Sequence, residues 1–274
     1  MLLVFVTAQA MSVSCSKDDD DNGSSSFNNQ QVTISDDGKA SNGGVFSSLD
    51  DKTFYLDYIK YEVEEGHLVV SGYDKTGFNG VAKIVARITY KSNSYEVLEI
   101  DREAFSGCNK LTSVSIPNSV TSIGYNAFRG CSGLTSIRVE KGNQNYDSRD
   151  NCNAIIETST NTLIAGCSKT IIPNSVTSIG SSAFYGCSEL TSIIIPNSVT
   201  SIEYFAFYGC TGLKYIHCLS SIPPKTRWID NNGTDYSAFS FDTYQNATLY
   251  VPKGSIETYK ATFGWEPFKN IVEE

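Results

Sequence analysis

The eight cysteines are the residues of this sequence best suited to chemistry, because thiols can pair, bind metal or act as nucleophiles. Tetrahedral zinc needs Cys or His pairs at short spacing, and no such pair occurs. Four of the thiols share the context Ala-Phe-x-Gly-Cys and are separated by 23, 56 and 23 residues: Cys108, Cys131, Cys187 and Cys210.

Corresponding residues of stacked repeats lie about 4.8 Å apart. A disulfide between such neighbours is within reach, but their parallel side-chain directions favour a ladder of buried, reduced thiols. Cys167 shares the Gly-Cys context and is expected in the same ladder, whereas Cys152 is not assigned.

No other set of residues indicates catalysis. The serines recur as letters of a repeated phrase, and His217 is the only histidine in the repeats, so no nucleophile has a base assigned to it. No phosphate loop or paired-carboxylate motif occurs, and we predict no enzyme, no cofactor and no metal. Asp147, Asp150 and Asn151 lack the spacing of a calcium loop and indicate a solvated turn.

The first residues indicate export. Residues 1–14 are apolar but too short to span a bilayer, which takes about 20 apolar residues, and they fit a signal peptide. Cys15 follows small residues, which resembles the lipobox of bacterial lipoproteins, and four Asp follow at 18–21, which resembles a Bacteroidetes surface-export signal. We expect lipid on Cys15, a cell-surface location anchored in the outer membrane, and a flexible tether over residues 15–48. A cleaved signal with an incidental Cys is the alternative.

A phrase of 23 residues organises the chain that follows. Its cleanest copy runs over residues 172–194 and begins again at Ile195. A fixed period of this size is typical of a solenoid. Leu-x-x-Ile-x-Ile predicts a strand with alternating faces, Val-Thr-Ser-Ile-Gly a short element on the opposite side, Ala-Phe a core plug, and Gly-Cys a turn.

The phrase resembles the BspA-like leucine-rich-repeat surface lipoproteins of Bacteroidetes over residues 95–252. The resemblance implies surface display and, for some members, adhesion to host proteins. We therefore predict a β-rich leucine-rich-repeat solenoid of short parallel strands. An antiparallel β cap (49–94) would close its N-terminal end, and a C-terminal cap (253–274) with a short helix over 255–261 would be sealed by Trp265, Phe268 and Ile271. Cap strands are expected at 54–63, 67–73 and 81–90.

One repeat departs from the period, because the step from Val139 to Ile172 is 33 residues. The added segment predicts a hairpin that turns at 158–161. Since insertions in repeats fall on loops, we expect a local bulge on the convex or edge side.

The concave sheet of a solenoid is its usual binding surface. Two outward positions of each repeat strand give these candidate ligand-binding residues: Ser113, Ser115, Ser136, Arg138, Lys169, Ile171, Ser192, Ile194, Tyr215 and His217. Short Ser and Ile side chains that only cover a sheet are an equally good interpretation.

Three functions remain open. The first is adhesion to a host or matrix protein. The second is glycan binding, with Tyr215 and Trp228 or Tyr236 as stacking platforms. The third is a structural envelope role without a ligand. The charge of -9 without a basic run argues against nucleic acid or an anionic membrane surface as partner. We expect a monomer whose only membrane contact is the N-terminal lipid.

Overall fold

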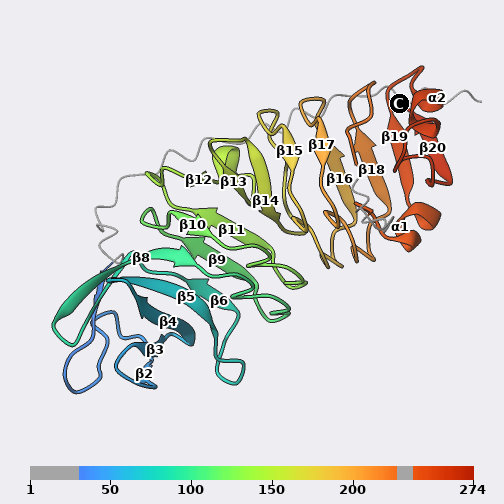
Figure 1. The fold of residues 1–274 in the computed structure, drawn as a ribbon. Coiled ribbons are helices and arrows are strands. Elements are labelled where there is room, and N and C mark those ends of the chain that lie inside the picture. Colours follow the sequence, from blue (N-terminus) through green and yellow to red (C-terminus); the bar gives the residue numbers. More distant parts are fainter. Residues whose placement is uncertain (1–30, 227–236) are drawn as a thin grey trace, which may run out of the picture.

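The protein is an elongated stack of short β-strands that runs from one end of the molecule to the other (Figure 1). A computed structural model describes residues 31–226 and 237–274. Parallel sheets, few short helical elements and antiparallel hairpins at the N-terminal end confirm the prediction of a β-rich fold of short parallel strands. The predicted signal peptide, Cys15, Trp228 and Tyr236 lie outside the described residues.

The N-terminal cap is a mixed sheet. Its strands are β1 (Gln31–Thr33), β2 (Phe46–Ser48), β3 (Thr53–Leu56), β4 (Ile59–Glu64), β5 (His67–Tyr73), β7 (Arg87–Tyr90) and β8 (Asn93–Ile100). The hairpins β2–β3–β4–β5 and β7–β8 are antiparallel, while β1 pairs with β7 and β5 with β8 in parallel. β8 then pairs with β10 (Ser122–Ile123) of the first full repeat, which joins the cap to the stack.

Three expectations for this region were wrong. The tether prediction fails for residues 31–48, because Val32 and Ile34 alternate into the core and residues 31–33 pair with β7. The predicted strand 54–63 is broken by a tight turn at Asp57 and Tyr58, both with positive φ. The predicted strand 81–90 is also broken, and its first part, β6 (Val81–Lys83), belongs to the repeats.

One side of the stack consists of repeat strands of three or four residues, which we call the long-strand face. It contains β6, β9 (Ser113–Ile116) and β11 (Ser136–Val139) in one parallel sheet, and β16 (Ser192–Ile195), β18 (Tyr215–Cys218), β19 (Thr248–Val251) and β20 (Asn270–Glu273) in a second. Their burial alternates, as the Leu-x-x-Ile-x-Ile pattern predicts. Residues 168–171, which were expected to supply a strand between the two sheets, form none.

The opposite side carries the two-residue strands of the phrase and the added segment. β12 (Tyr146–Asp147), β13 (Ala154–Glu157), β14 (Thr162–Gly166), β15 (Ser178–Ile179) and β17 (Ser201–Ile202) form one sheet, with a 3-10 turn at Arg149–Asn151. The hairpin predicted to turn at 158–161 is confirmed as β13–β14.

The hairpin is not the peripheral bulge that we expected. Strand side chains alternate between faces, and the two faces of this hairpin pack into two different cores. Ile155 and Ala165 belong to the N-terminal core, whereas Ile156 and Leu163 belong to the C-terminal one. The added segment therefore divides the hydrophobic interior of the solenoid.

The Phe plugs show the same division. Rings stack between Phe105 and Phe128 (5.5 Å between centroids) and between Phe184 and Phe207 (4.9 Å). Across the added segment the repeat ladder changes partner: Gly166 N–H, rather than a Phe N–H, donates to Ala183 O at 2.8 Å. Gly130 N–H still donates to Tyr185 O at 3.0 Å, as its counterparts in the other repeats do, so the hairpin replaces the neighbouring repeat only at the Phe position.

The C-terminal end is closed by aromatic packing around two short helices, α1 (Phe241–Asn246) and α2 (Ile256–Lys260). Trp265 is fully buried and its indole N–H donates to Pro224 O at 2.8 Å. Phe268 is buried and Ile271 packs at the edge of the core, as predicted. The sheet extends past the expected boundary at residue 252, because β20 pairs in parallel with β19.

Candidate functional site

The repeat thiols are buried and unbridged. All seven cysteines of the described chain are free thiols with little exposure. Cys131 Sγ–H donates to Phe105 O at 3.1 Å, and Cys210 Sγ–H donates to Phe184 O at 3.0 Å, one repeat back in each case. Burial raises the pKa of Cys131 and of Cys187 to about 12. The ladder consists of packing thiols and is not a reactive centre.

In the acidic turn of the added segment, Arg149 pairs with the carboxylate of Asp147. Asp147 accepts from Arg149 Nε at 2.8 Å and from Nη2 at 2.7 Å. Arg149 also donates to Asn161 Oδ1 at 2.8 Å, which ties the turn to the hairpin. Among residues 31–226 and 237–274, no three His, Cys, Asp or Glu side chains lie close enough together to hold a metal ion.

The N-terminal half of the long-strand face is polar. Ser113 lies opposite Ser136, and Ser115 opposite Arg138, in the register of β9 and β11. Arg138 is exposed, and so is Lys83 on β6, which pairs with Ser115 from the other side. Small hydroxyls, separate cations and one exposed apolar side chain, Val81, form this half.

The C-terminal half of the same face is apolar and aromatic. Ile194, His217, Tyr250 and Val272 lie side by side across four strands, and Tyr215 lies in the parallel row next to them that begins at Ser192. The His217 ring stacks on Tyr250 at 4.5 Å between centroids, and its Nδ1 lies 2.9 Å from Glu274 Oε2. Tyr215 is 47% exposed and Ile194 55%. Four strands therefore present large side chains to solvent in one patch.

Two candidates, Lys169 and Ile171, lie outside both sheets. Both are exposed, but Thr170 between them is buried, and its hydroxyl donates to Asn153 O at 2.6 Å. The N–H of Ile171 donates to Cys152 O at 3.0 Å instead of to a repeat strand. The added segment thus replaces the expected strand, and it separates the polar half of the face from the apolar half.

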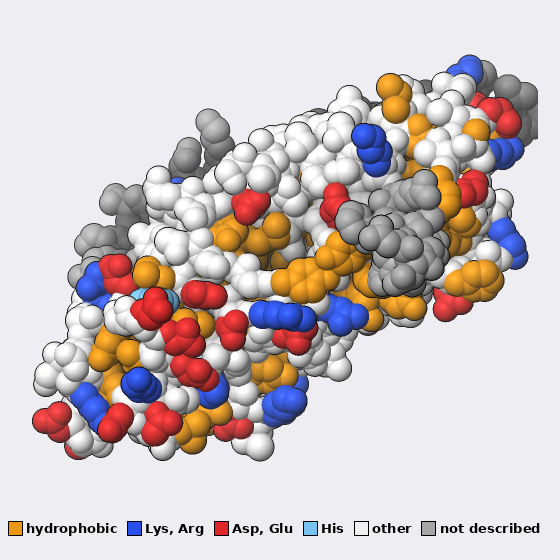
Figure 2. All heavy atoms as spheres, in the orientation of Figure 1, with side chains coloured by type: hydrophobic (Ala, Val, Ile, Leu, Met, Phe, Trp, Pro, Cys, Tyr) orange, Lys and Arg blue, Asp and Glu red, His pale blue; other side chains and the backbone are white. Residues whose placement is uncertain are grey.

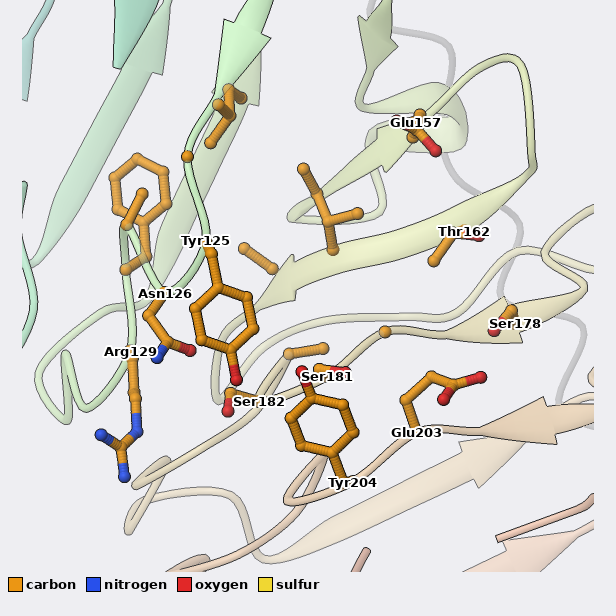
Figure 3. Close-up of a pocket in the computed structure, with 18 of the residues that line it drawn as sticks. Tyr125, Asn126, Arg129, Glu157, Thr162, Ser178, Ser181, Ser182, Glu203 and Tyr204 are labelled. Atoms are coloured by element: carbon orange, nitrogen blue, oxygen red, sulfur yellow. The ribbon is translucent and has the colours of Figure 1, made fainter. Parts of the chain in front are cut away.

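A hollow of about 520 Å³ opens at the break in the repeats, and none of the ten candidate residues lines it. We call it the repeat-break hollow. It lies between the turn at residues 123–129 and residues 178–183, with β14 and Tyr204 along its walls. Figure 2 shows it as a recess in the middle of one face, and Figure 3 shows the side chains that point into it. Its volume is in the range of small-molecule sites, about 300–1,000 Å³.

The hollow has aromatic and polar walls. The ring centroids of Tyr125 and Tyr204 lie 6.4 Å apart, and the hydroxyl ends of the two rings point toward one another, with Ser182 beside the Tyr125 hydroxyl (Figure 3). Burial, and then the Tyr204 hydroxyl, raise the pKa of Tyr125 above its usual value. Glu157 and Glu203 line the opposite side. Phenol rings, hydroxyls and carboxylates thus surround one cavity.

Three polar atoms at the hollow lack partners. In the described chain, five buried side-chain nitrogen or oxygen atoms make no hydrogen bond, and three of them belong to lining residues: Asn126 Oδ1, Arg129 Nε and Ser182 Oγ. The guanidinium of Arg129 stacks over the Tyr185 ring at 3.8 Å. The side chains of Ser182 and Asn126 interact with the Tyr125 hydroxyl and counter part of the rise in its pKa. Neither Ser182 Oγ nor Asn126 Oδ1, however, makes a hydrogen bond of ordinary geometry.

Our sequence reasoning missed these residues, although the phrase carries a signal for them. The positions between Ile-Gly and Ala-Phe, and the one after Ala-Phe, differ from repeat to repeat: Tyr125, Asn126 and Arg129 in one copy, but Ser181, Ser182 and Tyr185 in the next. We predicted no role for them, because we considered only the two outward strand positions as variable. Their variation was as large as that of the strand positions that we chose as candidates.

In the parts of the chain that the structure describes, no helix has the length and apolar content needed to cross a membrane. A comparison with curated proteins found no match.

Several solved structures are similar to this chain. A leucine-rich repeat protein from Bacteroides ovatus is 27% identical, with a TM-score of 0.43, over 73% of this chain and 47% of the other. One from Bacteroides capillosus is 23% identical (TM-score 0.35; 61% and 99% covered). A leucine rich cell surface protein from Faecalibacterium prausnitzii is 18% identical (TM-score 0.29; 83% and 96% covered). This chain spans about half the length of the Bacteroides ovatus structure.

The repeats themselves identify the family. The family described as "BspA type Leucine rich repeat region" matches residues 84–163 and 157–232, in six copies. These matches cover more than half of the 274 residues and include the Phe plugs and the thiol ladder described above. The chain therefore belongs to the family of BspA-type leucine-rich repeat proteins.

Proposed function

We propose that this chain is a lipid-anchored cell-surface protein that binds an extracellular protein, of a host or of its matrix, through the long-strand face. The observation that carries the proposal is a patch in which Ile194, Tyr215 and Val272 are exposed and His217 and Tyr250 are half-buried. A solvent-facing sheet needs no large apolar side chains for its stability. When they gather in one patch, they mark an interaction surface.

The composition of the patch favours a protein as ligand. Protein interfaces have aromatic and apolar centres with charged groups at the rim. Here Tyr215 and Ile194 supply the centre, while Arg138 and Lys169 lie toward the other half of the face. In a protein of net charge -9, exposed cations on the binding side favour a partner with carboxylates beside an apolar patch.

Surface plasmon resonance on the immobilised full chain, against a panel of extracellular-matrix proteins, tests the proposal. Tyr215→Ala should weaken binding by about tenfold or more, because truncating a central Tyr typically costs more than about 1.4 kcal/mol. Arg138→Ala should mainly slow association and reduce its dependence on salt.

Tyr208→Ala is the matched control. Tyr208 is 41% exposed and stacks on Tyr185, so it resembles Tyr215 in exposure, but it belongs to the turn after Phe207 and not to a repeat strand. Equal loss of binding in both variants, or none in Tyr215→Ala, would place the protein-binding surface elsewhere.

The anchor is tested separately. Cys15 follows an apolar stretch and precedes the acidic run at 18–21. Acyl chains add roughly 0.8 kcal/mol of membrane binding per buried CH₂. Cys15→Ala should therefore move the protein from the membrane fraction to the soluble fraction. Unchanged retention in the membrane would exclude a lipid on Cys15.

A further inference from the structure

We propose that the repeat-break hollow is a second binding site, and that it takes a neutral saccharide unit. The proposal does not depend on protein binding by the long-strand face, because the two surfaces share no residues. It starts from the unpaired polar atoms. A buried polar group without a partner costs about 1–3 kcal/mol, so three such atoms around one cavity point to an occupant that satisfies them.

The backbone holds two of these side chains in a conformation that recurs along the repeats. The residue before Ala-Phe has positive φ in four repeats: Glu103 (59°), Asn126 (60°), Ser182 (56°) and Phe205 (57°). This conformation costs an L-residue roughly 1–2 kcal/mol and is normally given to glycine. None of the four copies uses Gly, although Gly would relieve the strain. Side chains are retained at this position, and in two neighbouring copies they face the hollow.

Ser182 is the strongest single indication. Its side chain is held by a strained backbone, the residue is only 7% exposed, and its hydroxyl has no hydrogen-bond partner among the described residues. Figure 3 shows it beside the hydroxyl end of Tyr125.

The unpaired groups indicate the chemistry of the occupant. Arg129 Nε can only donate, Asn126 Oδ1 can only accept, and the Ser182 hydroxyl can do both. Adjacent hydroxyls of a sugar ring donate and accept at once, so they fit this mixture. Two tyrosine rings offer apolar faces for the C–H side of the ring.

Charge excludes the simpler occupants. Glu157 and Glu203 line the hollow and would repel an anion such as phosphate or a uronic acid. A cation would be repelled by the guanidinium of Arg129, which also lines the cavity, and it would offer no hydrogen-bond acceptor to Arg129 Nε. A neutral, hydroxyl-rich ligand with an apolar face remains.

Isothermal titration calorimetry on the full chain tests the proposal. The probes are neutral oligosaccharides of glucose, galactose, mannose and xylose at millimolar concentration, with one sulfated and one uronic-acid oligosaccharide. We expect at least one neutral saccharide to bind. Asn126→Gly and Ser182→Gly together should weaken that binding by tenfold or more, with the melting temperature unchanged or raised because each Gly relieves a positive-φ residue.

Glu103→Gly is the matched control, since it makes the same backbone change in a repeat that does not line the hollow. It should leave saccharide binding unchanged. The proposal is overturned if no neutral saccharide binds, if only the charged probes bind, or if the double variant binds as tightly as the unaltered chain.

Discussion

Gly166→Ala is a sharp test of how the added hairpin closes the solenoid. Gly166 ends β14, and a Cβ at this position would lie 2.2 Å from Phe184 Cε1 and 2.5 Å from Cζ. The Phe184 ring cannot move away freely, because it is fully buried and stacks on Phe207 at 4.9 Å. The N–H of Gly166 also holds Ala183 O at 2.8 Å, which fixes the backbone.

The expected loss follows from this geometry. Adding a methyl group to a packed core typically costs about 1–3 kcal/mol. In a domain of this size, each kcal/mol lowers the melting temperature by about 2–4 °C. Thermal unfolding followed by circular dichroism gives the shift directly. Phe184→Leu, combined with Gly166→Ala, should recover part of the stability, because the smaller side chain makes room for the methyl group.

Gly72→Ala is the control for this prediction. Gly72 also lies in a strand, β5, but a Cβ there would meet Ala104 O at 3.8 Å, an ordinary contact. Removing the flexibility of this glycine from the unfolded chain should leave stability unchanged or raise it slightly. Equal melting temperatures for the two variants would refute our account of the seam between hairpin and repeat.

Two further predictions concern the core. Burial raises the pKa of Cys131 and of Cys187 to about 12, so the folded state holds protons that the unfolded state releases above about pH 8.5–9. The stability that these two thiols contribute is complete below that pH and is lost as the pH rises toward 12. The free energy of unfolding falls by about 1.4 kcal/mol per thiol and pH unit in this range. Equal urea midpoints at pH 8 and pH 10 would contradict this expectation. Trp265→Phe leaves Pro224 O without its buried donor and should cost about 1–3 kcal/mol, measured as a urea midpoint; an unchanged midpoint would mean that the hydrogen bond contributes no net stability.

The regular part of this fold could be predicted because equivalent positions of successive repeats have the same structural environment. Phe105 and Phe207 are both core plugs, and Cys131 and Cys210 both donate to a carbonyl one repeat back. A residue type and a period of 23 were enough to place them. The same reasoning placed Trp265 in the C-terminal cap, where a large apolar side chain near the end of a stack must cover exposed core.

Local turns without glycine could not be predicted in the same way. Asp57 and Tyr58 adopt positive φ without the Asn-Gly or Asp-Gly pattern that usually indicates such a turn, so one predicted strand became two. Residues 31–33 were assigned to a tether because their surroundings are polar. Val32, Ile34 and Ala40 bury their side chains in the stretch 31–48, and three apolar residues do not change the composition of the segment.

The hollow depends on a long-range arrangement that no single repeat contains. Asn126 and Ser182 are 56 residues apart, and they line one cavity together with strand β14 of the added hairpin. The sequence indicated that the period was broken at this place. It did not indicate that the added segment would enter the core. Ile155 packs into one core and Ile156 into the other, and this arrangement depends on tertiary packing that the sequence of the segment alone does not contain.

The central claim is that this scaffold binds a protein on the long-strand face. The most direct measurement is the affinity of Tyr215→Ala, compared with that of the unaltered chain, for a matrix protein that binds the latter. We predict a loss of tenfold or more for Tyr215→Ala and none for the variant with Asn126→Gly and Ser182→Gly. Full affinity of Tyr215→Ala would contradict the claim, and a loss confined to the double variant would move protein binding to the hollow.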